Sequence, residues 1–201
     1  MAPAYGNLMT FNKETFMRIF GHLAMMVIMS VFLTTTASAF LIRYDGPYEG
    51  RVIDAETKQP IEGVVVLGVW YKQIPNVAGS NSIYYDAKET VTDKNGEFRI
   101  EGLGLKIFSY VGTMHVLLFK AGHEYLGLWP WETLKEDGML RESIKWEGEK
   151  AIIPLKKFTM EERKKRHADK ELIPDQKQKL LIRELNKEYK ELGIPLYPEV
   201  D

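Results

Sequence analysis

Residues 48–69 read Tyr48-Glu-Gly-Arg-Val-Ile-Asp54, then Ala-Glu-Thr-Lys-Gln-Pro60, then Ile-Glu-Gly63-Val-Val-Val-Leu-Gly-Val69. A strand ending at an acidic residue, a polar turn closed by proline and an almost wholly apolar strand follow one another. A companion signal lies at 92–98, where Asp-Lys-Asn-Gly separates two strand-like segments. Asn and Gly tolerate the positive φ that a tight hairpin turn requires. Together these stretches predict the scaffold of the domain.

Further short strands are expected at about 64–71, 89–92, 97–101, 105–110, 115–121 and 150–155. The strand at 64–71 has apolar residues on both faces, so it should be central and covered on both sides. Residues 72–85 lose the alternation and carry Pro, Gly, Asn and Ser, which predicts a long loop of the kind often used for binding. About seven short strands, and no helical period before residue 158, indicate a mainly β, seven-stranded antiparallel β-sandwich.

Several of these motifs occur together in one known family. They are Gly50-Arg-Val-Ile-Asp54, the turn with Pro60 and Gly63, the Val-rich strand, Thr92-Asp-Lys-Asn-Gly-Glu-Phe98 and Leu-Leu-Phe-Lys-Ala-Gly122-His. In these motifs the chain resembles the carboxypeptidase regulatory-like domain, a transthyretin-like, Ig-like sandwich, over about 48–156. It departs from the family at 72–85 and at 125–146. Members are usually non-catalytic modules attached to peptidases, transporters or envelope proteins, so the resemblance implies a scaffold and is nearly silent on activity.

The composition excludes several classes of protein. The 201 residues suit one globular domain with appendages, and 45% hydrophobic content is ample for a core. The net charge of −1, from 27 basic and 28 acidic residues, gives no overall field for nucleic acid. Cysteine is absent, which excludes disulfides, thiol nucleophiles, thiolate metal sites and the lipid-attachment cysteine of a bacterial lipoprotein.

The N-terminal region has the form of an export signal. A basic start at Arg18, an apolar run at 23–33 and the ending Ala37-Ser-Ala39 predict a signal peptide at 1–39, with the mature chain beginning at Phe40. The signal is complete from Met17, which we expect to be the true start. The alternative is a retained membrane anchor at 19–42, where the chain would contact the membrane. In both cases the remaining chain is expected outside the cytoplasm, in the periplasm or the extracellular space.

After the sandwich at 40–157, residues 158–201 are expected to form a helical C-terminal extension. Thr159 and Glu162 form a capping-box pattern, so a solvated helix should begin there and run to about 169. A second helix is expected from Pro174 to Gly193. Its apolar stripe packs on the sandwich or on the first helix, or forms a docking face for another protein or a homodimer. The stripe residues proposed for partner contact are Leu181, Leu185 and Tyr189.

No catalytic, cofactor or metal site is expected. His115 and His123 match no metal-ligand spacing, and nucleophile-elbow and phosphate-cradling motifs are absent. Asp54 and Asp93 are interpreted as turn residues that accept hydrogen bonds from local backbone amides. The sequence therefore favours a protein that is not an enzyme.

Aromatic residues at 125–131 are the remaining candidate for recognition. Tyr125, Trp129 and Trp131 lie on a Pro-containing segment, and such rings can stack on sugars or anchor a protein partner. More often, such rings close one end of a sandwich. We expect an exported, non-catalytic module with a binding or structural role in the cell envelope, whose partner is another envelope protein or a second copy. The alternatives are a membrane-anchored accessory subunit of an envelope complex and a glycan-binding module.

Overall fold

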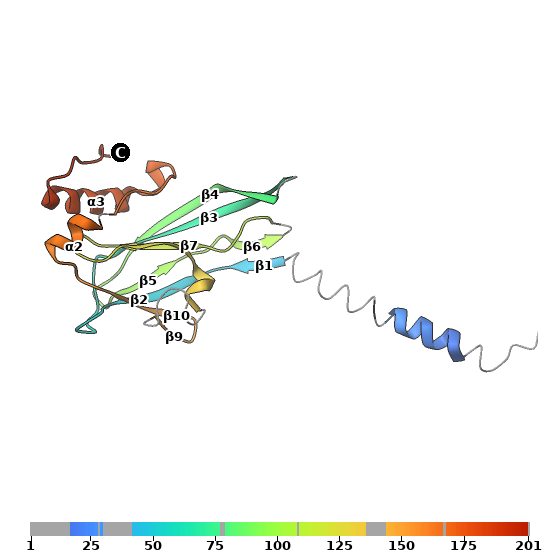
Figure 1. Ribbon diagram of the computed structural model, residues 1–201. Coiled ribbons are helices and arrows are strands. Elements are labelled where there is room, and N and C mark those ends of the chain that lie inside the picture. The colour runs from blue at the N-terminus through green and yellow to red at the C-terminus, as the bar shows by residue number, and fades with distance from the viewer. Residues whose placement is uncertain are drawn as a thin grey trace, which may run out of the picture. The chain divides into compact units, whose positions relative to one another are not determined.

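The computed structural model of the protein describes residues 17–27, 29, 42–76, 79–107, 109–135, 144–166 and 168–200. The chain divides into two compact units, Met1–Arg43 and Tyr44–Asp201. In the first unit, residues 17–27 form a helix (Figure 1). Among the helices that the structure describes, none combines the length and apolarity needed to cross a bilayer. The expected cleavage site after Ala39 lies outside the described residues.

Most of the described chain is strand. The described strands are β1 (Ile42–Asp45), β2 (Tyr48–Asp54), β3 (Val65–Asn76), β4 (Gly79–Val91), β5 (Glu97–Ile100), β6 (Gly104–Ile107), β7 (His115–Phe119), β8 (Leu126–Pro130), β9 (Lys145–Glu147) and β10 (Lys150–Leu155). They form one sheet of order β5-β2-β10-β9, a second of order β4-β3-β7-β8, and a two-stranded sheet of β1 and β6 (Figure 1).

The mainly β class with a C-terminal helix is confirmed, but the prediction of seven antiparallel strands is wrong in detail. The described residues form ten strands in three sheets, and β2 pairs with β10 in parallel, with Val52 opposite Ile153. The strands missed are β1, β8 and β9, which have three to five residues each. Such short segments give too few alternating positions to be recognised from periodicity.

The two four-stranded sheets share one core. Val52 and Ile153 contribute from one sheet and Val66 and Trp70 from the other, and all four side chains are fully buried. This arrangement follows from the alternation of side chains along each strand, which turns every second residue toward the opposite sheet. Burial of apolar area contributes about 25 cal/mol per Å², so these side chains and the rest of the cluster stabilise the unit.

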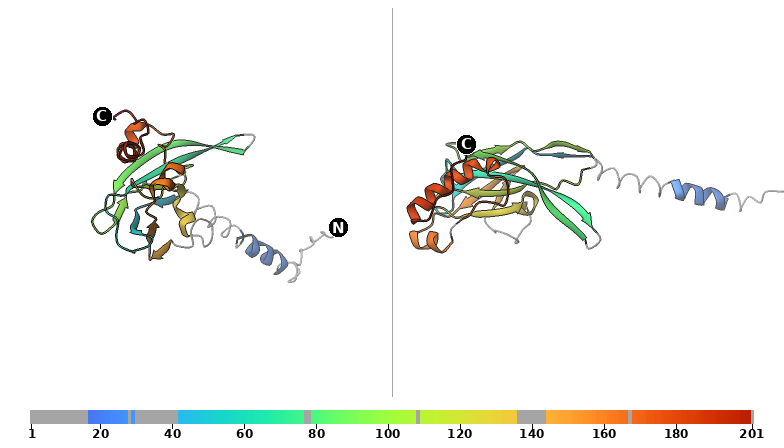
Figure 2. Two further views of the ribbon diagram at one scale, coloured as in Figure 1. Left: turned by 60° about the vertical axis from the view of Figure 1, so that its left-hand side comes forward. Right: turned by 90° about the horizontal axis from the view of Figure 1, so that it is seen from above.

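A second core lies on the outer face of β3 and β7, where the C-terminal helix α3 (Lys179–Leu192) covers the sheet (Figure 2). Leu67 and Leu117 point to this side and pack with Leu181 and Leu185. The prediction that the 64–71 strand is central and covered on both sides is therefore confirmed, with a sheet on one side and a helix on the other.

The C-terminal extension contains less helix than expected. Its elements are α2 (Met160–Lys165), the 3-10 helix η2 (Asp175–Lys177) and α3; a further 3-10 helix, η1 (Trp131–Lys135), follows β8. The capping box is confirmed, since Thr159 accepts from the amide of Glu162 and the Glu162 carboxylate accepts from the Thr159 amide. Gly193 ends α3 with φ of 71°, as expected. Pro174 precedes η2 instead of opening α3.

The expectation that the first helix is solvated is wrong at one position. Arg163 of α2 is buried and donates from Nε and Nη2 to the carboxylate of Glu188 on α3, at 2.7 and 2.6 Å. A guanidinium is buried without large cost only when its charge is paired in this bidentate way. The basic residues of α2 gave no sequence signal for which of them would turn inward.

Replacing Thr159 with alanine is expected to lower the free energy of unfolding by about 1 kcal/mol, because the hydroxyl satisfies an otherwise unpaired amide at the start of α2. Thr159→Ser keeps the hydroxyl and serves as the control, with little change. Urea denaturation of both variants measures the difference. Equal losses in the two variants would mean that the methyl group, rather than the cap, accounts for the effect.

Candidate functional site

The tryptophans at 129 and 131 do not form a joint platform. Trp129 on β8 is 42% exposed, whereas Trp131 is 6% exposed and lies in the core between the sheets. The Trp131 ring packs edge-on against Tyr48 and Trp146, with ring centroids 5.5 Å apart in both cases. The hypothesis of two exposed rings side by side is thus wrong, and Trp131 closes the core instead.

Tyr125 is half-buried and linked to the C-terminal extension. Its hydroxyl donates to Glu171 at 2.8 Å, and its ring lies 6.0 Å from that of Phe119. Burial, together with the neighbouring Glu171 carboxylate, raises the pKa of the Tyr125 hydroxyl above its ordinary value. The residue therefore holds the segment before α3 against the sheet.

The apolar stripe of α3 is part of the core. Leu181 and Leu185 are fully buried, and Tyr189 is buried with its hydroxyl donating to the carbonyl of Ala168 at 2.7 Å. The docking-face hypothesis for these three residues is therefore wrong, because strands of the same chain already occupy the surface that a partner would need. The alternative in which the stripe packs on the sheets is the one the structure contains.

Three carboxylates, none of them singled out in the sequence, attach α3 to the sheets. Glu89 of β4 accepts from the amides of Leu180 and Leu181 at 2.9 and 2.8 Å, so a strand residue caps the helix N-terminus. Glu184 and Glu188 of α3 accept from the amides of residues 121 and 122, in the turn after β7. Burial raises the pKa of Glu89, although the two amide hydrogen bonds favour its charged form. These hydrogen bonds between carboxylates and backbone amides attach α3 to the sheets.

The two histidines lie in separate environments. The His115 ring packs edge-on against Tyr71, with centroids 5.1 Å apart, and Nδ1 of His123 lies 3.2 Å from the carbonyl oxygen of Ala121. Burial lowers the pKa of both imidazoles below the ordinary value of histidine. Within the described ranges, no group of three or more His, Cys, Asp or Glu side chains is arranged to hold a metal ion.

A cavity of about 380 Å³ lies between α3 and the C-terminal tail. Its lining combines two basic residues, Lys179 and Arg183, with one acidic residue, Glu199. Because charged side chains of both signs make up half of the lining, it lacks the mainly apolar character of a typical ligand pocket.

The strongest polar feature is a buried network around Asp45, at the end of β1. Its carboxylate accepts from Lys106 Nζ at 2.7 Å, from Trp70 Nε1 at 2.8 Å and from Tyr48 Oη at 2.7 Å. The amide of Leu103 is a fourth donor, at 2.9 Å. Burial alone would raise the pKa of Asp45, but these hydrogen bonds and the Lys106 charge outweigh it and hold the pKa below its ordinary value. The network ties the small β1-β6 sheet to the core.

The predicted loop at 72–85 is instead a two-stranded arm. The distal part of β3 pairs with the beginning of β4, and the pairs run from Lys72 opposite Ile83 to Asn76 opposite Gly79. β7 accompanies β3 only from Val65 to Val69, so the arm extends beyond the sheet and projects from it (Figure 2). The prediction of an irregular loop is wrong, because both faces of the arm are exposed and no apolar alternation is needed there.

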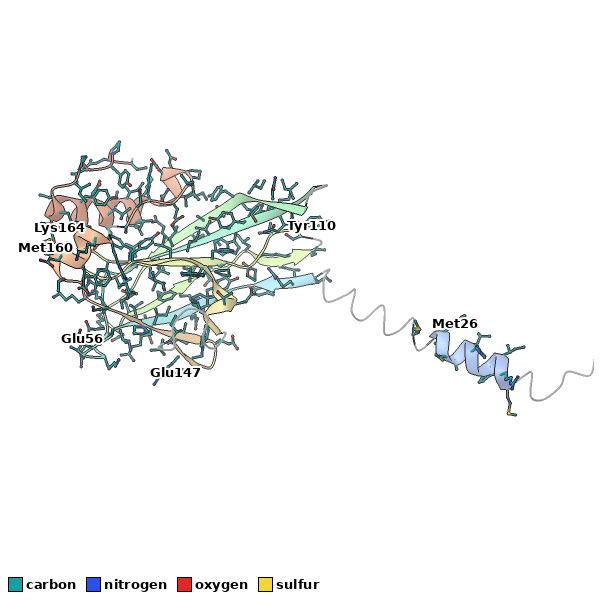
Figure 3. All side chains as sticks on the ribbon, in the orientation of Figure 1. Met26, Glu56, Tyr110, Glu147, Met160 and Lys164 are labelled. Atoms are coloured by element: carbon teal, nitrogen blue, oxygen red, sulfur yellow. The ribbon has the colours of Figure 1, made fainter. Side chains whose placement is uncertain are left out.

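The base of the arm is joined to the Asp45 network. The amide of Gln73 donates to the carbonyl of Tyr110, and the amide of Gly112 donates to the carbonyl of Tyr71, both at 2.9 Å. Lys106 Nζ, besides its bond to Asp45, donates to the Gly112 carbonyl at 2.8 Å. β1, β6, residues 109–112 and the arm therefore lie at one end of the unit (Figure 3, where Tyr110 is labelled).

This end exposes large apolar and aromatic side chains that are between 42% and 69% exposed. We call it the apolar end, and define it by Tyr44, Ile74, Ile83, Leu105, Ile107 and Tyr110. Single exposed apolar residues are normal on a protein surface, but a group gathered at one end of a unit is typical of an interaction site.

Few acidic residues belong to the segments of the apolar end. Within 44–47, 71–76, 79–85, 102–107 and 109–114, Asp45 is the one acidic residue, and it is buried. From outside these segments, the exposed Glu132 of η1 accepts a hydrogen bond from Thr113 Oγ1 at 2.6 Å. Residues 71–85 and 102–114 contain no Asp or Glu, and this pattern in the sequence could have indicated the site. The two segments lie at the same end of the unit because the arm pairs with residues 110–112.

The comparisons with known proteins give no relative for this arrangement. No family model matches the chain, and no curated protein or solved structure matches it either.

Proposed function

We propose that the protein is an exported, non-catalytic module of the cell envelope that binds through its apolar end. The observation that carries the proposal is the group of exposed apolar side chains on the arm and on β6, beside a buried ionic network that ties β1 and β6 to the core. Rigid presentation reduces the entropy lost on binding, so such a surface suits recognition better than a mobile loop does.

We further propose that the fold is of the carboxypeptidase regulatory-like, transthyretin-like class. The support is the pair of four-stranded sheets around one core, together with the turn motifs at Asp54 and Asp93. Both aspartates accept from backbone amides two to four residues further on, as such turns require. In that class the β scaffold displays binding segments without taking part in a reaction.

A membrane-anchored accessory subunit is the second candidate, favoured by the apolar run at 23–33 that precedes β1 in the chain. Mass spectrometry of the N-terminal peptide of the native protein separates the two. A mature chain beginning at Phe40 supports the exported module, and a chain that keeps residues 19–42 in the membrane fraction supports the anchored subunit.

Site-specific photocrosslinking in cells tests the binding surface. A photoreactive amino acid at position 74 or 83 should give crosslinked products at least about tenfold more abundant than the same group at position 172 or 196, since these four side chains are all exposed but only the first two lie on the arm. Equal crosslinking at all four positions, or a purely cytoplasmic location, would contradict the proposed function.

A further inference from the structure

The hydrogen bonds at the base of the arm fix the direction of its backbone groups. The Gln73 amide donates to the carbonyl of Tyr110, and the Tyr71 carbonyl accepts from the amide of Gly112. Gln73 and Tyr71 therefore turn their backbone groups away from β4. Successive residues of a strand direct these groups to opposite sides, so residues 72, 74 and 76 face β4 and form the hydrogen-bonded pairs of the arm.

The other side of the arm is the free edge of β4. The β4 residues opposite 72, 74 and 76 are 83, 81 and 79, so their backbone groups point to β3. The backbone groups that point outward are those of Ser80, Ser82 and Tyr84. β4 is the outermost strand of its sheet, and in the part of the chain that the structure describes no further strand pairs with it along the arm (Figure 2). This edge therefore offers backbone donors and acceptors to an added strand.

The two edges of the arm differ in protection. Pro75 of β3 turns to the same side as Gln73, and it has no N–H group to offer to an added strand. The β4 edge has no such protection, because residues 79–85 read Gly-Ser-Asn-Ser-Ile-Tyr-Tyr, without proline or a charged side chain. The first charged residue after them, Asp86, is paired with Lys177 of η2. The β4 edge is therefore the side of the arm that suits strand addition.

A second copy of the same segment fits this edge. The outward residues are spaced symmetrically about Ser82, so two antiparallel copies pair Ser82 with Ser82 and Ser80 with Tyr84 in both directions. Each such pair exchanges two backbone hydrogen bonds, and no like charges come to lie opposite each other. The segment is already extended in both copies, so pairing costs little chain entropy.

We infer that two copies of the chain join edge to edge through residues 80–84 of β4, with Ser82 at the two-fold axis. In the joined arms the outer edges are those of β3, where Pro75 disfavours a further strand, so assembly ends at the dimer. Ile83, which is exposed in one copy, gains Asn81 of the second copy as its cross-strand neighbour. This inference names the partner of the proposed binding end and rests on that function.

Disulfide trapping of the full chain in cells tests the inference. The chain has no cysteine, so a disulfide-linked dimer of a single-cysteine variant must form through the introduced residue. After treatment with a membrane-permeable oxidant, Ser82→Cys should give at least about tenfold more dimer than Ser80→Cys on non-reducing electrophoresis. Opposed residues of such a pair have Cα atoms about 5.5 Å apart, within disulfide range, whereas the two copies of residue 80 lie about 14 Å apart. The control is matched, since both serines are exposed and each is hydrogen-bonded to Gln73.

A proline on the free edge provides a second test. Ser82→Pro removes an N–H that points outward, so the arm keeps its own ladder while the pair at the two-fold axis loses both hydrogen bonds. Ser82→Ala also lacks the hydroxyl but keeps the N–H, and it is the control. The protein beginning at Phe40 retains the compact unit with both cores. In sedimentation equilibrium at up to about 100 µM, since a short edge pairing is weak, the dimer of Ser82→Pro should dissociate at least about tenfold more readily than that of Ser82→Ala.

The inference is overturned if the parent is monomeric at that concentration, if Ser82→Cys gives no more dimer than Ser80→Cys, or if Ser82→Pro dimerises like Ser82→Ala. Photocrosslinking in cells separates this failure from that of the proposed function. Crosslinks from positions 74 and 83 of a monomeric chain to a different protein would remove the second copy as the partner and leave the binding function standing. Equal crosslinking at the arm and at the control positions would remove both.

Discussion

Replacing Asp45 with alanine is expected to lower the free energy of unfolding by about 3–5 kcal/mol, because it leaves the buried ammonium group of Lys106 without its counter-charge. The side chains of Asp45 and Lys106 are 1% and 7% exposed, so water cannot take over the lost interaction. The donors on Tyr48 and Trp70 also lose their acceptor. Chemical denaturation followed by tryptophan fluorescence measures the loss.

A double-variant cycle separates the charge from the packing. Asp45→Ala combined with Lys106→Met removes both charges and should be less destabilised than the sum of the two single variants. The exposed pair of Arg99 and Glu101 is the control, and Glu101→Ala should leave the denaturation midpoint almost unchanged. If Asp45→Ala behaved like Glu101→Ala, the network could not be the element that holds the apolar end rigid.

The stabilisation that Asp45 provides is expected to depend on pH, and Asp45→Ala should remove this dependence. The folded-state pKa of Asp45 lies below its ordinary value, because the hydrogen bonds to the carboxylate outweigh burial. The folded state therefore binds this proton less readily than the unfolded chain, and the stabilisation is fully present above about pH 4 and lost as the pH falls through the lower folded-state pKa. Thermal melts on either side of that pH should show a shallower acid slope for Asp45→Ala than for the parent.

The hydrogen-bond network around Asp45 could not be predicted from the sequence. Asp45-Gly-Pro47 has the residue types of a simple turn, yet Asp45 is bound by residues up to 61 positions away. Local propensity fixes a turn, whereas the pairing of β1 with β6 decides which donors surround the carboxylate. The hairpin at 92–98 and the capping box at Thr159 could be predicted because their hydrogen bonds close within four residues.

The arm was misread for a related reason. Apolar and polar residues alternate along a strand when one of its faces is buried. A two-stranded ribbon that is exposed on both faces therefore shows no such alternation. Ser80 and Ser82 belong to strands through their backbone pairing with Pro75 and Gln73, although their side chains are typical of loops. The expectation that 72–85 takes part in binding remains a prediction, now attached to a two-stranded ribbon.

The C-terminal stripe is the case in which the sequence was informative but allowed two outcomes. The 3.6-residue period located the apolar face of α3, and Gly193 located its end. What the period cannot state is which surface covers that face. The deciding contacts come from Glu89 and from residues of β3 and β7, far away in the sequence.

Replacing Leu185 with alanine is expected to lower the free energy of unfolding by about 2–5 kcal/mol, because the side chain is fully buried between α3 and the sheet and its removal leaves a cavity. Leu172→Ala is the matched control: the same atoms are removed from a fully exposed leucine in the same extension, and the change should stay within about 0.5 kcal/mol. Urea denaturation compares the two. Equal stability of the two variants would mean that α3 does not pack on β3 and β7 in solution, and its stripe would then again be a surface open to a partner.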